Sequence, residues 1–210
     1  MLMCLLKRTA DGDFFSDEEL QYICEELQAN PSFTDMTIRY GTASYFNRIK
    51  KVVRRDRIGE VVFCVIRPNG KIILTRCKNY PESIYRIPTG GIGHNERIID
   101  AIFREVKEEL GLAVKIRDFL GVIRIRFEHG DEHALFYSYI FILDEIGGRL
   151  LEDASDDEIS EIKEVDVEQM EAIVGSLNEI KGKWHDWGKF RYITSNAVLR
   201  YLIKARSRQN

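Results

Sequence analysis

The stretch GGIGHNERIIDAIFREVKEELGL, from Gly90 to Leu112, joins a glycine-rich turn to a segment that ends in three glutamates. Apolar residues recur there at three- and four-residue spacing and Gly111 follows them, which predicts a helix over residues 96–110. The apolar face of this helix is expected to hold Ile98, Ile99, Ile102, Phe103, Val106 and Leu110. The adjoining arc holds Glu105, Glu108 and Glu109, so the acids border the buried face instead of lying opposite it.

Carboxylates three and four residues apart on a helix repel, at a cost on the order of 0.2 to 0.5 kcal/mol per pair. On a partly shielded surface their pKa values would rise unless a cation occupied the site. Mg²⁺ prefers carboxylate oxygens and recruits substrate phosphates, so an acidic helix edge suits it. The glycines at 90, 91 and 93 let the backbone approach a ligand beside a helix N-terminus, whose dipole favours anions. These residues predict a site for a divalent metal and a diphosphate.

The same stretch resembles the signature of the Nudix hydrolases. That signature reads Gly, five residues, Glu, seven residues, Arg-Glu, an aliphatic residue, any residue, Glu-Glu, any residue, Gly and an aliphatic residue. The chain meets every position with Gly90, Glu96, Arg104-Glu105-Val106, Glu108-Glu109 and Gly111-Leu112. The resemblance implies an α+β fold, a Nudix-like α/β/α sandwich with a mixed sheet, and the order of the flanking strands extends it from about residue 57 to 204.

By this resemblance the metal ligands are Glu105, Glu108 and Glu109, with the backbone carbonyl of Gly90 or Gly91 as a further one. The metal would be Mg²⁺, with Mn²⁺ as the alternative. Glu96 and Arg104 would form an ion pair that orients the catalytic helix. The implied reaction is hydrolysis of a diphosphate bond in a small nucleotide, or in a nucleoside diphosphate linked to another group, by an activated water.

Other site residues are less sharply indicated. For the general base we rank Glu105 first, followed by Glu158 and Glu161 from an acidic loop. Gly90, Gly91 and Arg86 are expected to contact the substrate, although an arginine in a strand is more often a surface ion-pair partner. Four aromatic residues could stack on a base, but aromatics at such positions usually belong to the core: Tyr85, Phe127, Trp184 and Trp187.

Subfamily markers outside the signature leave the substrate open. ADP-ribose pyrophosphatases resemble one another in a proline about fifteen residues beyond the signature, where this chain has Phe127 and Glu128, which disfavours ADP-ribose. The tyrosine typical of dinucleoside-polyphosphate hydrolases is replaced by His129 and Gly130. Two alternatives remain: a nucleotide-sensing or nucleic-acid-binding regulator, and an RNA 5′-end pyrophosphohydrolase. The complete set of glutamates argues against a regulator freed from catalysis.

The rest of the chain predicts one domain with an extension. We divide it into an N-terminal extension, residues 1–55, and a Nudix domain, residues 56–210. A capping box at Ser16 predicts a short helix, and seven basic residues with interleaved aromatics follow from Arg39 to Arg57, typical of a solvated face, of a face paired with acids, or of an RNA contact. The extension is expected to pack on the domain or on a partner subunit in a homodimer.

Composition narrows the setting of the protein. The chain has 31 Lys plus Arg, 34 Asp plus Glu and a net charge of -3, which gives no global reason to expect nucleic acid. The four cysteines show no metal-binding or disulfide spacing. No apolar run is long enough to cross a membrane, and the opening MLMCLLKR is too short for a secretory core, so we expect a cytoplasmic protein that does not contact membranes.

Overall fold

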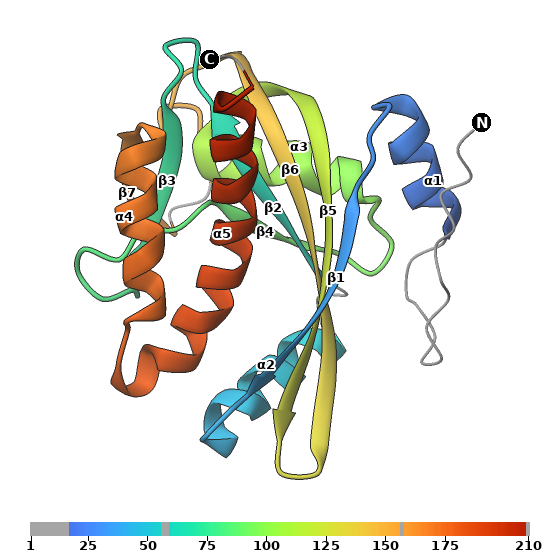
Figure 1. Ribbon diagram of the computed structural model, residues 1–210, viewed down its shortest axis with the longest axis vertical. Helices are drawn as coiled ribbons and strands as arrows, with labels where there is room; N and C mark the ends of the chain where they lie inside the picture. The colour runs from blue at the N-terminus through green and yellow to red at the C-terminus, as the bar shows by residue number, and fades with distance from the viewer. Residues whose placement is uncertain (1–16, 56–58, 156–157, 209–210) are drawn as a thin grey trace.

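A computed structural model describes residues 17–55, 59–155 and 158–208 (Figure 1). The capping box predicted at Ser16 lies outside these residues. Within them the strands form one seven-stranded sheet in the order β1-β5-β6-β2-β3-β7, with β4 paired to β2. The strands are β1 (Ser32–Arg39), β2 (Gly59–Ile66), β3 (Ile72–Cys77), β4 (Thr89–Ile92), β5 (Leu112–His129), β6 (Glu132–Gly148) and β7 (Ile159–Val165).

Helices cover both faces of this sheet (Figure 1). They are α1 (Asp17–Glu26), α2 (Ala43–Arg55), α3 (Ile98–Leu110), α4 (Val167–Asn178) and α5 (His185–Arg206), with a 3₁₀ turn at Gly182–Trp184. Strand β2 shows how the sequence separates the layers, because successive side chains of a strand point to opposite faces. Val61 and Phe63 join the core beneath α1 and α3, whereas Val62 and Cys64 join the core beneath α2, α4 and α5.

The sheet is mixed, as expected. β1 runs parallel to β5, and β2 runs parallel to β6. β5 and β6 form a long antiparallel hairpin that turns at Gly130, whose φ of 58° lies in the left-handed region. The α/β/α sandwich is therefore confirmed. No helix in the described part of the chain is both long enough and apolar enough to span a bilayer.

Two local expectations were wrong, and one strand was not expected. Arg86, which we took to lie in a strand, makes only one isolated bridge, to Thr75, and the strand β4 begins later, at Thr89. Phe103 is exposed on α3, and the smaller Ala101 is buried in its place. The strand β1 was not expected at all: it places part of the predicted extension at the edge of the sheet, beside β5.

Candidate active site

The glycine pair lies in a strand that packs next to α3. β4 pairs antiparallel with β2, and this pairing sets Gly90 opposite Val61 and Gly91 opposite Glu60. After β4 the chain turns so that the Gly93 N–H donates to the Glu96 carboxylate at 2.9 Å. The first turn of α3 receives a partner from α1, because the Ile98 N–H donates to Glu19 Oε1 at 2.7 Å. At its other end Gly111 ends the helix with a left-handed φ of 71°, as predicted.

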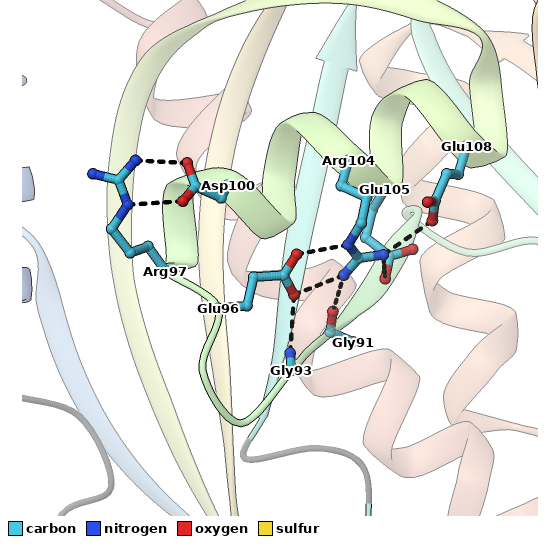
Figure 2. A network of polar contacts seen from close by, with 8 residues as sticks. All are labelled: Gly91, Gly93, Glu96, Arg97, Asp100, Arg104, Glu105 and Glu108. Carbon is cyan, nitrogen blue, oxygen red and sulfur yellow. Dashed lines mark hydrogen bonds and ion pairs between the residues drawn. The ribbon is translucent and has the colours of Figure 1, made fainter.

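Arg104 is the centre of the polar network at this site (Figure 2). Nε and Nη2 donate to the two oxygens of Glu96, at 2.6 and 2.8 Å. Nη1 donates to Glu105 at 2.9 Å and to Glu108 at 3.0 Å, and Nη2 also donates to the Gly91 carbonyl at 2.8 Å. These five bonds use all five guanidinium N–H donors. The ion pair between Glu96 and Arg104 that the family resemblance implied is thus present, and it ties α3 to both the glycine turn and β4.

The electrostatics follow from these bonds. The Arg104 guanidinium lowers the pKa of Glu96 below its ordinary value, against the opposing effect of burial. Reciprocally, the hydrogen bonds that Arg104 donates to Glu96 raise the pKa of Arg104, with Glu105 and Glu108 adding to the effect. Both groups are therefore charged at neutral pH. The pair is a fixed structural element and does not supply a titrating group.

Glu105 lies directly over Gly90. A Cβ atom added to Gly90 would stand 2.0 Å from Glu105 Cγ and 2.1 Å from Cδ, which is far inside a normal contact. The glycine is therefore required here because the acid occupies the space of its side chain. Glu105 and Glu109 are both buried, with 8% and 5% of their surface exposed.

Arg86 is buried, and its guanidinium interacts electrostatically with Glu109 of α3. Its guanidinium donates to the Tyr80 hydroxyl at 3.0 Å and to the Ile87 carbonyl at 2.9 Å. Burial acts to lower the pKa of Arg86, but the interactions with Tyr80, Cys77 and Glu109 outweigh it and the pKa is raised. Arg86 is therefore a buried, permanently charged partner of the acidic edge, and the surface ion pair that we weighed as its commoner role is excluded by its 5% exposure.

The oxygen ligands at this site are of the type that binds a divalent metal, but their side chains do not converge on one point. Carboxylates on one helix edge, beside a backbone carbonyl, are the hard oxygen ligands that Mg²⁺ prefers. Among the described residues, however, no three His, Cys, Asp or Glu side chains converge as the ligands of one ion would. Arg104 explains part of this, because its Nη1 holds Glu105 and Glu108. The Glu105 side chain fills the space that a Cβ of residue 90 would take, so this acid is held at the glycine turn.

The two alternative bases lie elsewhere. Glu161, on β7, accepts hydrogen bonds from Tyr85 and Arg76, and these lower its pKa, which weakens it as a base. Glu158 precedes β7, and its backbone carbonyl accepts the Lys78 N–H at 3.0 Å. Its side chain lines a cavity on the α5 side of the sheet, away from the bonds around Arg104.

Sequence reasoning missed one buried charge pair. Glu60 on β2 is 2% exposed and accepts two bonds from Arg191 of α5, the shorter at 2.7 Å, and one from the Ser138 hydroxyl at 2.8 Å. Glu60 and Arg191 both line the cavity that Glu158 lines. An acid at the start of an apolar strand was the available signal, because acids are almost never fully buried unless they are paired.

Comparisons with known proteins identify the family of this chain. A family model described as the NUDIX domain matches residues 56–188. The ADP-ribose pyrophosphatase of Methanocaldococcus jannaschii is 37% identical over 87 residues, which cover 41% of this chain and 50% of that protein. The chain thus spans about half the length of this curated relative.

Solved structures give weaker likenesses. A UDP-X diphosphatase is 17% identical with a TM-score of 0.42, and the match covers 72% of this chain and 68% of that one. The dihydroneopterin triphosphate pyrophosphohydrolase of E. coli is 14% identical with a TM-score of 0.48, and the match covers 71% of this chain and 97% of that one. The family assignment rests on the domain match and the complete signature. On these two grounds the chain belongs to the Nudix family of hydrolases, whose members generally use divalent metal ions.

Proposed function

We propose that the protein is a Mg²⁺-dependent pyrophosphohydrolase that cleaves the diphosphate bond of a nucleoside diphosphate linked to another group. Mn²⁺ is the alternative metal. The observation that carries this proposal is the placement of Glu105 against Gly90, with Arg104 holding the same helix edge to Glu96 and to the Gly91 carbonyl. A buried carboxylate loses its hydration, so holding these acids beside the glycine turn costs free energy unless a cation binds there.

In this proposal Glu105, Glu108 and Glu109 hold the metal together with the Gly90 carbonyl. A bound divalent ion would supply a more acidic water and would neutralise charge on the bridging oxygens. The Gly91 carbonyl accepts a bond from Arg104, and we take the Gly90 carbonyl as the backbone ligand that the family resemblance implies. Glu105 remains our first candidate for the general base, ahead of Glu158, because Glu105 adjoins the glycine turn.

The diphosphate would bind over the turn. Gly90 and Gly91 leave room for a close approach of phosphate oxygens to the backbone. Arg86 is buried and interacts with Glu109, so it would supply a fixed positive charge without needing to reach the surface. Arg104 positions the acids and does not touch the substrate, because its donors are already engaged.

The substrate class is narrowed by the curated relative. The similarity to an ADP-ribose pyrophosphatase favours a nucleoside diphosphate joined to a sugar, although the proline that marks that subfamily is missing at Phe127 and Glu128. Hydrolysis of ADP-ribose adds one water across the P–O–P bond and yields AMP and ribose 5-phosphate. ADP-ribose is therefore the first compound to assay, followed by other nucleotide sugars, dinucleoside polyphosphates and nucleoside triphosphates.

The test is a product-resolved assay of this panel with Mg²⁺, on the wild type and on two glutamine variants. Glu109→Gln should abolish metal-dependent turnover, because it removes a carboxylate from the buried edge. Glu171→Gln, on the exposed surface of α4, is the matched control and should turn over like the wild type. Unchanged turnover of Glu109→Gln would refute the role of this helix edge, and no turnover of any panel member by the wild type would refute the enzyme.

The alternatives have less support. Two residues of the basic stretch that suggested RNA are engaged with acids: Arg39 pairs with Glu128 at 3.0 Å and Lys50 with Glu132. This favours the reading in which the basic face is paired within the chain. A regulator would bind a nucleotide without hydrolysing it, so the same assay would show no product.

A further inference from the structure

A cavity of about 650 Å³ lies on the α5 side of the sheet, opposite the face that carries α3. Its walls come from α2, from the segment that follows β3, and from the start of α5. Small-molecule sites in proteins typically enclose 300 to 1,000 Å³, so this volume suits a nucleoside. Neither the family signature nor the bonds around Arg104 involve it.

Aromatic side chains form one wall of the cavity. The Tyr80 ring lies 4.5 Å from that of Trp187 and 6.0 Å from that of Trp184, and the two tryptophan rings are 5.4 Å apart. Such a wall offers flat, weakly polar surfaces, on which a planar heterocycle can stack. The sequence had suggested Trp184 and Trp187 as stacking residues without committing to them, and the structure brings them together at one cavity.

Charged groups lie between the aromatic surfaces. The Arg191 guanidinium at the base of the cavity is paired with Glu60, yet its Nε–H is buried and has no acceptor among the described residues. Arg48 is exposed at the rim and makes no ion pair within the described part of the chain. A ligand that combines a flat ring bearing acceptor atoms with a phosphate would satisfy both of these groups.

The cavity shares a wall with the acidic site. Tyr80 and Cys77 line the cavity, and both accept from the Arg86 guanidinium, at 3.0 and 3.7 Å respectively. Arg86 in turn interacts electrostatically with Glu109 on α3. Glu60, which also lines the cavity, stands opposite Gly91 in the pairing of β2 with β4, so a substrate in the cavity would have its phosphates near the glycine turn.

The helix α2 lies outside the residues that match the family model and yet builds much of this cavity. It contributes Tyr45, Arg48, Ile49, Val52 and Val53. Burial raises the pKa of Tyr45 to about 12, against the effects of Arg191 and Arg48, so its hydroxyl stays neutral and can donate to a ligand. The contacts of α2 thus come from outside the part of the chain that matches the family model.

We propose that this cavity binds the base-carrying half of the substrate, and that Tyr45 and Arg48 of α2 determine which nucleotide fits. This inference rests on the proposed function for the identity of the substrate. It assigns α2, within the predicted extension, a role in specificity in addition to its packing on the sheet.

Tryptophan fluorescence tests the inference without catalysis. The chain has two tryptophans, and both line the cavity, so a base bound there should quench the emission. We would titrate the full-length protein, without added metal, with AMP and separately with ribose 5-phosphate. AMP should quench and ribose 5-phosphate should not, because the sugar phosphate has no ring to stack.

Three variants locate the binding. Arg48→Ala changes an exposed side chain, so its fold should survive, and it should weaken AMP binding roughly tenfold. Tyr45→Ala should weaken binding similarly, with circular dichroism as the check on folding. Lys51→Ala, on the exposed surface of the same helix and outside the cavity lining, should bind AMP like the wild type.

The outcomes separate this inference from the proposed function. Hydrolysis of a nucleotide substrate with no quenching by AMP, or with an unchanged KM in Arg48→Ala, would overturn the cavity assignment and leave the enzyme standing. Quenching by AMP that Arg48→Ala weakens would support the cavity assignment even if no substrate in the panel were hydrolysed, and the failed hydrolysis would count against the proposed function alone.

Discussion

Replacing Gly90 by alanine is the most direct perturbation of the site. The new Cβ would stand 2.0 Å from Glu105 Cγ, and carbon atoms in contact prefer about 3.5 to 4.0 Å, so the glutamate must move by about 1.5 Å. Its 2.9 Å bond from Arg104 would then be lost. Overpacking costs about 1 to 3 kcal/mol and a charge-assisted bond contributes about 1.5 to 3 kcal/mol, while the more restricted unfolded chain returns up to about 1 kcal/mol. The net loss should be about 1.5 to 6 kcal/mol.

Two measurements follow from this displacement. Urea unfolding should show the loss of stability directly, and misplacing a reacting group by about 1 Å should cost turnover on the order of 100-fold. Gly175→Ala is the matched control, because an added Cβ meets no atom within 4 Å there, and alanine in a helix should stabilise by about 0.5 to 1 kcal/mol. A Gly90→Ala protein with unaltered stability and unaltered turnover would refute the contact between Gly90 and Glu105.

Three further predictions concern the charge networks. Arg104→Lys keeps the charge but offers three donors in place of five, so it should weaken metal affinity about 10- to 100-fold. The Mg²⁺ dependence of turnover measures this affinity. An unaltered half-saturating Mg²⁺ concentration would contradict the prediction. The pKa of Glu96 is lowered from its ordinary 4.5, so its contribution to stability is present at neutral pH and is lost as pH falls through the lowered value. The stability gap between wild type and Glu96→Gln in urea should therefore shrink below about pH 4.5, and a gap that widens there would be inconsistent with the ion pair. Arg191→Met leaves the buried Glu60 carboxylate without its ion-pair partner and should lower the free energy of unfolding in urea by about 3 to 5 kcal/mol. Adding Glu60→Gln should recover part of that loss. Equal stability of the single and double variants would show that the two groups are not coupled.

Local sequence patterns were sufficient for the acidic helix and its partners. Helical spacing and Gly111 predicted α3 to within two residues at its start, and the resemblance supplied the ion pair between Glu96 and Arg104. The helical period alone placed Phe103 in the core, where Ala101 lies instead, because both fall near the edge of the apolar arc and packing decides between them.

Features built from distant segments were not predictable in this way. In β1 only Ile38 is fully buried, so the strand carries little apolar alternation, and its partner β5 lies more than 80 residues along the chain. The pair of Glu60 and Arg191 joins residues 131 apart, and no local pattern marks it. The cavity combines α2 with the start of α5, which the sequence separates by over a hundred residues.

The position of β1 has a practical consequence for anyone who wishes to isolate the part of the chain that matches the family model. A shortened protein that began at residue 56 would leave the backbone donors and acceptors of β5 exposed along the line where β1 now pairs, and such open strands readily recruit other chains. It would also lose Ile38, Tyr40 and Phe46, which fill the core beneath α5. The matched region by itself should therefore be prone to self-association. The residues that precede it prevent this by pairing β1 with the edge of β5.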